Sequence, residues 1–132
     1  MHVNILIADD QKQYRDFLRR MLESNPAVSV VAEAANGEQA VQLTQLLKPD
    51  LMLLDMDMPQ VDGLNIAREV RSRRLPIRII LMSLLGDAAH QRAALASGAD
   101  AFISKDAPVN ELFSSIWKIA RAATADVGSA AR

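Results

Sequence analysis

Five side chains with reactive or charged groups follow apolar runs of the 132-residue chain, each where a run ends. They are Asp9, Asp10, Asp55, Ser83 and Lys105. Carboxylates packed together repel one another, so a convergence of the three acids would call for a compensating cation. Oxygen ligands of this kind suit Mg²⁺, which also favours a phosphate in its shell. A lysine and a hydroxyl nearby would hold further phosphoryl oxygens, so the chemistry indicated is phosphoryl transfer.

Asp55 closes the run LMLL, and an apolar strand does not normally end on a charge unless the charge has a function. An aspartate with a pKa near ~4 is ionised at neutral pH and attacks phosphorus without a general base. We therefore interpret Asp55 as a nucleophile that becomes an aspartyl phosphate.

The elements that must position these groups alternate between short apolar runs and longer segments with helical spacing. The apolar runs are Val3–Ala8, Val28–Ala34, Leu51–Leu54, Arg78–Met82 and Ala101–Ser104. This alternation predicts an α/β fold of the flavodoxin-like (βα)5 type, a doubly wound parallel sheet with strand order 2-1-3-4-5. Ligands of such sheets bind beyond the carboxyl ends of the strands, at the switch point between strands 1 and 3. That order would bring all five side chains to one edge.

Composition sets limits on other functions. The net charge is −1, the pI is about 6.1, and cysteine is absent. We expect no direct nucleic-acid binding by this chain, no disulfide and no thiolate metal site. The apolar runs are far shorter than the ~20 residues of a membrane span, so we expect no membrane insertion and a cytoplasmic location. One domain is predicted over residues 1–123, and residues 124–132 are expected to form a flexible tail or the start of a linker.

Four separated motifs resemble the response-regulator receiver domain of two-component signalling in type, order and spacing. They are ILIADDQ, LLDMDMPQVDG, LMS and AFISKDAP, and the match covers roughly residues 3 to 123. The resemblance implies Mg²⁺ ligation by Asp10, Asp55 and the backbone carbonyl of Asp57, with Asp9 acting mainly through water. It also implies that Asp55 takes its phosphoryl group from the phosphohistidine of a sensor histidine kinase.

The resemblance further implies a regulatory phosphoacceptor, not an enzyme with turnover beyond self-phosphorylation and autodephosphorylation. Lys105 is at the phosphate-binding lysine position, Ser83 at the switch hydroxyl and Phe102 at the aromatic switch. Phosphorylation would then alter the face formed by the fourth helix, the fifth strand and the fifth helix. That face would control an output DNA-binding domain or a partner protein, and a homodimer formed on phosphorylation is a further expectation.

One departure from the family pattern concerns Asp106, which follows Lys105 where many receivers have a proline after a cis peptide. The sequence Lys105-Asp106-Ala107 instead resembles the branch whose members usually carry a C-terminal helix-turn-helix DNA-binding domain. Whether the chain is cut from a longer regulator or works alone stays open.

Several alternatives compete with these assignments. The stretch LLDMDM also resembles the first motif of haloacid-dehalogenase-type phosphatases, although here an acidic pair precedes it. A pseudo-receiver that has lost the chemistry is a third reading, and the intact acidic set argues against it. At single positions, Asp9 and Asp10 alone could be helix N-caps, the Asp57 side chain an exposed loop acid, and Phe102 a core residue.

Overall fold

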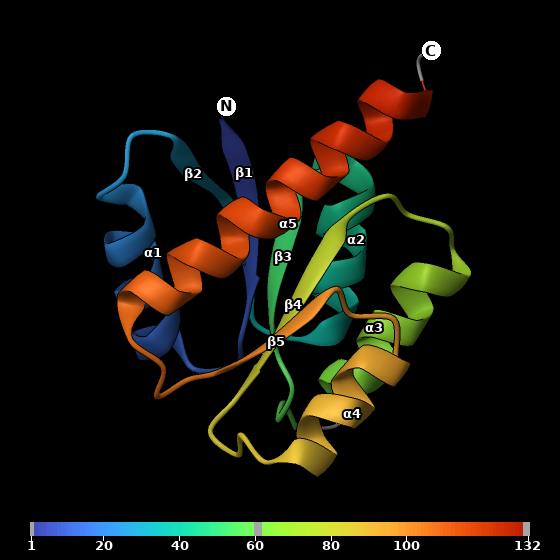
Figure 1. Ribbon diagram of the computed structural model, residues 1–132. Coiled ribbons are helices and arrows are strands. Elements are labelled where there is room, and N and C mark those ends of the chain that lie inside the picture. Colours follow the sequence, from blue (N-terminus) through green and yellow to red (C-terminus); the bar gives the residue numbers. More distant parts are fainter. Residues whose placement is uncertain (1, 60–61, 131–132) are drawn as a thin grey trace.

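One five-stranded parallel sheet forms the centre of the molecule, with helices on both faces (Figure 1). The computed structural model describes residues 2–59 and 62–130, with side chains described as far as residue 121. The elements are β1 (Val3–Ala8), α1 (Lys12–Glu23), β2 (Val28–Ala34), α2 (Gly37–Leu47), β3 (Leu51–Asp55), α3 (Gly63–Ser72), β4 (Arg78–Ser83), α4 (Ala88–Ala96), β5 (Ala101–Ser104) and α5 (Val109–Ala130). The strand order is β2-β1-β3-β4-β5, with every neighbouring pair parallel, which confirms the predicted fold.

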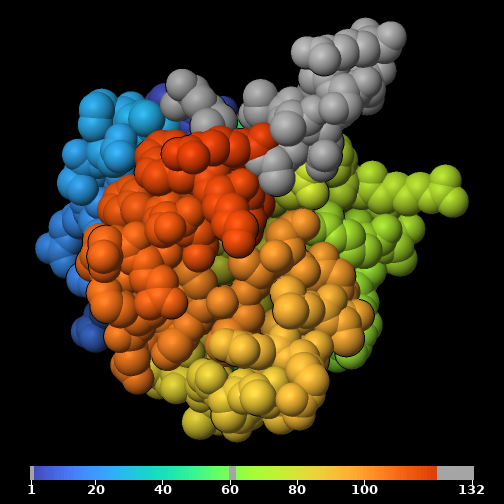
Figure 2. Space-filling view, viewed as in Figure 1, coloured from blue at the N-terminus to red at the C-terminus, as the bar shows by residue number. Residues whose placement is uncertain are grey.

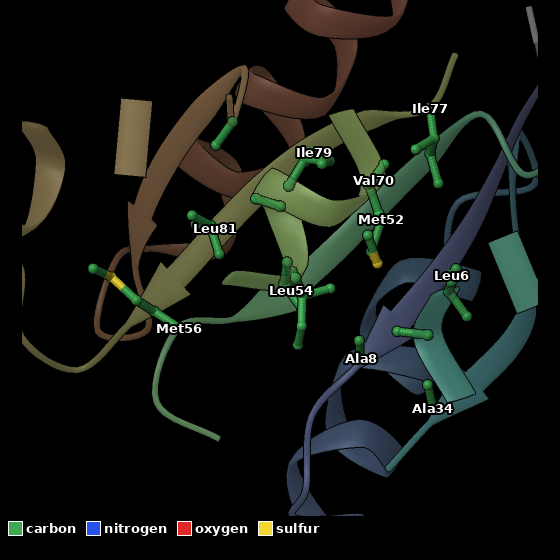
Figure 3. Packing of buried hydrophobic residues seen from close by; sticks show 14 of the residues in the cluster. Leu6, Ala8, Ala34, Met52, Leu54, Met56, Val70, Ile77, Ile79 and Leu81 are labelled. Atoms are coloured by element: carbon green, nitrogen blue, oxygen red, sulfur yellow. The ribbon is translucent and has the colours of Figure 1, made fainter. Parts of the chain in front are cut away.

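Alternate side chains of each central strand supply two separate cores. Ile5 and Ile7 of β1 pack under α1 and α5, where Leu18 and Ile116 are buried. Leu6 and Ala8 face the opposite layer of α2, α3 and α4 (Figure 3). Because both faces are covered, β1, β3 and β4 are nearly continuous in apolar residues, whereas the edge strand β2 includes Ser29 and Glu33.

Two of the candidate site residues are the last residues of their strands. β3 and β4 each extend one residue past the predicted apolar run, so Asp55 and Ser83 are the last residues of their strands. In register, Asp55 lies opposite Met82, and Ser83 opposite Ser104. The carboxyl ends of β3, β4 and β5 are therefore nearly level.

Helix α5 is longer than the sequence predicts. It runs to Ala130 and so continues through most of the segment 124–132, which was expected to be a flexible tail or linker. Residues 131 and 132 lie outside the described residues, and the domain boundary at residue 123 stays a prediction. No helix of the described chain is long and apolar enough to cross a membrane.

The peptide bond after Lys105 is trans, because the described residues contain no cis peptide. Asp106 thus follows the lysine without the cis geometry that the family pattern raised as a question. The turn is closed by local hydrogen bonds, from the Ala107 N–H to the Ser104 carbonyl and from the Asp106 N–H to Ser104 Oγ.

Candidate functional site

Three carboxylates meet at the carboxyl edge of the sheet, between β1 and β3. Asp9, Asp10 and Asp55 each offer an oxygen, and these oxygens all lie within 4.8 Å of one another. Asp9 and Asp55 are buried, at 2% and 5% exposure, whereas Asp10 is exposed. The predicted convergence of β1 and β3 is therefore present in the structure.

Asp9 is held on all sides by hydrogen bonds. Its Oδ1 accepts from the Gln11 N–H at 2.8 Å, and its backbone carbonyl accepts from Arg15 Nη1 at 2.7 Å. Neither Asp9 nor Asp10 occupies the N-cap position of α1, which is Gln11. The simple helix-cap interpretation of this acidic pair is thus wrong.

Lys105 reaches into the acidic cluster from the loop after β5. Its Nζ lies 2.9 Å from Asp9 Oδ2 and 3.4 Å from Asp55 Oδ1, and its side chain is only 11% exposed. The Tyr14 ring of α1 covers the same ammonium group, with Nζ 4.4 Å from the ring centroid. A cation over an aromatic face is stabilised further when water is excluded, so Tyr14 helps to hold Lys105 in place.

The pKa values of this cluster show which forces oppose one another. Burial raises the pKa of the Asp55 carboxyl, and neighbouring Asp9 raises it further, while the Asp57 N–H and Lys105 lower it. Burial alone would lower the pKa of Lys105, but its hydrogen bond to Asp9 and the charge of Asp55 outweigh burial and raise it. The charged form of Lys105 is therefore stabilised by its carboxylate partners. The charged form of Asp55 is destabilised by burial more than it is stabilised by Lys105.

Ser83 and Asp57 form a second group beside Asp55. The Ser83 hydroxyl donates to Asp57 Oδ2 at 2.6 Å and accepts from the Leu85 N–H at 3.0 Å. The Asp57 N–H donates to Asp55 Oδ1 at 3.0 Å. Asp57 is exposed, as the loop-acid interpretation expects, but its side chain has a defined partner.

Phe102 lies apart from the carboxylates, on the edge strand β5, which β4 separates from β3. It is partly buried and packs against the core beneath α2, α3 and α4. This placement agrees with the core interpretation for this conformation, and strand β4 lies between the ring and the strand of Asp55.

Sequence reasoning missed the contacts of Tyr14, Arg15 and the Asp57 side chain. Tyr14 lies four residues after Asp10 and thus about one helical turn from the acidic pair. That spacing is the available signal for a ring near the site. No comparable signal exists for the hydrogen bond from Ser83 to Asp57, whose partners are 26 residues apart.

The charge balance of the site fits a divalent cation. Three carboxylates against the one ammonium of Lys105 leave two negative charges in a partly buried space. Hard oxygen donors of this type match Mg²⁺, and the exposed Asp10 leaves a side of the cluster open to the waters that this ion retains.

The sequence of this chain is similar to those of known response regulators. The family model described as "Response regulator receiver domain" matches residues 5–117. The nitrate/nitrite response regulator protein NarL of Escherichia coli K12 is 34% identical over 116 residues, which cover 88% of this chain and 54% of that protein. A protein-glutamate methylesterase/protein-glutamine glutaminase of Alkalilimnicola ehrlichii is 41% identical over 106 residues, covering 80% of this chain and 27% of that protein.

Solved structures agree with the sequence matches. The signal receiver domain of NarL from Mycobacterium tuberculosis superposes with a TM-score of 0.86 at 35% identity, covering 91% of this chain and 97% of that one. A LuxR-family regulator from Aurantimonas gives a TM-score of 0.88 at 28% identity, covering 92% and 87%. This chain spans between about a quarter and about half of the length of the curated relatives named above.

Proposed function

Because the chain belongs to the response regulator receiver domain family of two-component systems, we propose that it accepts a phosphoryl group on Asp55 from a sensor histidine kinase. The observation that carries the proposal is the cluster of Asp9, Asp10 and Asp55 with Lys105 buried among them. In this role the chain is regulatory and has only the chemistry of its own phosphorylation and dephosphorylation.

Asp10, Asp55 and the backbone carbonyl of Asp57 would hold Mg²⁺, with Asp9 acting mainly through water. When bound, the ion supplies positive charge that offsets the charge developing on the phosphoryl oxygens. Lys105 contributes a second positive charge from the opposite side of the carboxylates. Tyr14 and Asp9 keep that ammonium at the site before the phosphoryl group arrives.

The two oxygens of Asp55 have different surroundings. Oδ1 accepts from the Asp57 N–H and lies near Lys105, whereas Oδ2 has no hydrogen bond to any described residue. No buried side-chain oxygen in the described part of the chain lacks a partner, so Oδ2 must reach solvent. Oδ2 is thus the oxygen available to attack phosphorus.

Phosphorylation would change the surface through Ser83 and Phe102. The phosphoryl group adds acceptor oxygens beside Ser83, whose hydroxyl would turn to donate to one of them. Phe102 would move inward, and the face formed by α4, β5 and α5, which is turned toward the viewer in Figure 2, would change shape.

That face would control an output DNA-binding domain or a partner protein. A homodimer formed on phosphorylation is part of the same proposal. Sedimentation of the chain before and after phosphorylation would detect the dimer.

The proposal is tested by incubating the protein with a small acyl phosphate and Mg²⁺ and recording the intact mass. One phosphoryl group should be added to the wild-type chain, none to Asp55→Asn, and Mg²⁺ chelation should prevent the addition. Asp50→Asn, which alters an exposed carboxylate at the opposite end of β3, serves as the matched control and should label normally. Unchanged labelling of Asp55→Asn would refute the assignment.

The same experiment separates the alternatives. A haloacid-dehalogenase-type phosphatase would turn over a generic phosphate ester continuously, and a pseudo-receiver would gain no phosphoryl group. The receiver should incorporate one group and lose it slowly by hydrolysis.

A further inference from the structure

The hydroxyl of Ser83 is already engaged in the unphosphorylated protein. Ser83 is fully buried at 0% exposure, and its single proton is donated to Asp57 Oδ2 over 2.6 Å. Its oxygen accepts from the Leu85 N–H at 3.0 Å. A serine hydroxyl has one proton to donate, so Ser83 cannot serve Asp57 and a phosphoryl oxygen at once.

Asp57 is a strong competitor for that proton. Hydrogen bonds to an ionised acceptor are shorter and roughly twice as strong as those between neutral groups. The position of Asp57 is fixed by its own N–H, which donates to Asp55 Oδ1. The residue that accepts the Ser83 proton is therefore itself hydrogen-bonded to the residue that would be phosphorylated.

We propose that the Asp57 carboxylate is a latch that retains the Ser83 hydroxyl in the unphosphorylated position and so opposes switching. The proposal rests on the function proposed above, because it takes the phosphoryl group on Asp55 as the competing acceptor. Asp57 then sets how much of the phosphorylated protein is in the switched state, which is separate from binding Mg²⁺ through its backbone carbonyl.

The unequal burial of the two partners makes the latch directional. Asp57 is exposed and can be hydrated once it loses Ser83, whereas buried Ser83 needs another acceptor before it can leave. A phosphoryl oxygen would supply that acceptor. The hydroxyl thus moves when Asp55 is modified and stays in place otherwise.

Release of Ser83 also alters the loop that leads to α4. The hydroxyl is the acceptor for the Leu85 N–H, so its movement removes or redirects that hydrogen bond. Leu84 and Leu85 are 65% and 57% exposed, and Asp87 begins the adjoining helix as its N-cap. The latch therefore controls both the hydroxyl and the start of the α4 surface.

The test compares Asp57→Ala with the wild-type protein by titration with beryllofluoride, a phosphoryl mimic that is not hydrolysed, at saturating Mg²⁺. The Leu85 amide resonance reports the switch, because its hydrogen bond changes when Ser83 moves. We expect Asp57→Ala to bind the mimic about three- to tenfold more tightly. In the unliganded variant the Leu85 amide should also exchange with solvent faster than in the wild type.

Two further variants separate the latch from a general effect of charge. Asp106→Ala removes an exposed carboxylate from the β5–α5 loop and should leave the affinity unchanged. In a Ser83→Ala background, Asp57→Ala should no longer tighten binding. An equal gain in that background, or in Asp106→Ala, would overturn the latch while leaving the phosphoacceptor role intact. Failure of the wild type to bind the mimic, together with failure to label at Asp55, would overturn both proposals.

Discussion

At the scale of single residues, Asp55 combines two opposing requirements. In the proposed role it must be ionised to attack phosphorus, yet it is 5% exposed and lies beside a second buried carboxylate, Asp9. Lys105 offsets only part of this cost, since the pKa of Asp55 remains above its ordinary value. In the absence of a divalent cation, the ionised nucleophile is therefore a source of instability in the fold.

The sign of this effect gives a prediction for Asp55→Asn. A raised pKa means that folded Asp55 binds its proton more tightly than the unfolded chain does, so folding is penalised above the raised pKa. The penalty disappears as the pH falls below the ordinary value of 3.8. Without divalent cations, Asp55→Asn should unfold at a higher temperature than the wild type at pH 7, and the difference should narrow toward pH 4.

Thermal melts followed by circular dichroism across that pH range would measure the difference. Asp16→Asn, at an exposed i,i+4 pair with Lys12, is the control and should show little change at any pH. A difference for Asp55→Asn that is the same at pH 7 and pH 4 would contradict the assignment of the cost to ionisation.

The sequence predicted that Asp9, Asp10, Asp55 and Lys105 converge, because they follow apolar runs and parallel strands bring such positions to one edge. The hydrogen-bond partners of those residues were harder to predict from the sequence. Asp57 could be an exposed loop acid on sequence grounds, and only the fold shows that it accepts from Ser83 on another strand. Contacts of this kind depend on side-chain direction, which apolar periodicity does not encode.

At the scale of elements, Arg71 joins three segments on the side of the sheet away from the carboxylates. Its guanidinium donates to the Gly98 carbonyl at 2.8 Å, the Ile77 carbonyl at 2.6 Å and Asp100 Oδ2 at 2.7 Å. The structure shows a specific junction of α3 with the start of β4 and with the loop between α4 and β5.

We expect Arg71→Lys to lower the free energy of unfolding by about 1–3 kcal/mol, because an ammonium cannot reproduce the planar fork of a guanidinium. Arg73→Lys is the matched control. Arg73 forms an i,i+4 pair with Glu69 in which both side chains are 45% exposed, so this change should stay within about 0.5 kcal/mol. Urea unfolding of both variants measures the difference, and equal losses would show that the junction adds nothing.

Gly63 begins α3 in close contact with the end of β3. A Cβ at this position would lie 2.5 Å from the Asp55 carbonyl oxygen and 2.8 Å from Met56 Cα. Both are backbone atoms, so Gly63→Ala must displace the helix or the strand end, and overpacking of this kind costs about 1–3 kcal/mol.

The displacement should also slow phosphorylation, because Asp55 lies at the point of contact. Gly86→Ala is the control, since its Cβ would meet only the Ser104 side chain at 3.3 Å. Gly63→Ala should be labelled more slowly and should melt at a lower temperature than Gly86→Ala. A Gly63→Ala protein that folds and labels like Gly86→Ala would refute the close approach.

The elements themselves were predicted well where periodicity was strong. The strands begin where the apolar runs begin, because a sheet covered on both faces requires continuous apolar sequence. The helix at the end of the chain was the exception. TADVGSAAR has no apolar stripe, so the pattern gave no sign that α5 continues to Ala130.

At the scale of the whole molecule, folding and ion binding should be linked. The carboxylates converge only in the folded chain, so an ion that binds them stabilises the folded state. Added Mg²⁺ should raise the melting temperature of the wild type in a saturable way. At an ion concentration one hundred times the Kd, the free energy of unfolding should increase by about 2.7 kcal/mol.

Asp10→Asn removes one oxygen anion at the exposed side of the cluster and should weaken this stabilisation strongly. Sodium chloride at matched ionic strength provides the control for screening. An equal response to both salts, or an undiminished Mg²⁺ response in Asp10→Asn, would contradict a specific ion site.

The ion pair between Lys105 and Asp9 joins residues 96 positions apart, one following the first strand and the other the last. During synthesis Asp55 emerges from the ribosome well before Lys105 does. A nascent or prematurely terminated chain that ends before β5 would contain the acids without the cation that holds them together. Only a chain translated through β5 and Lys105 would carry the complete cluster of charges.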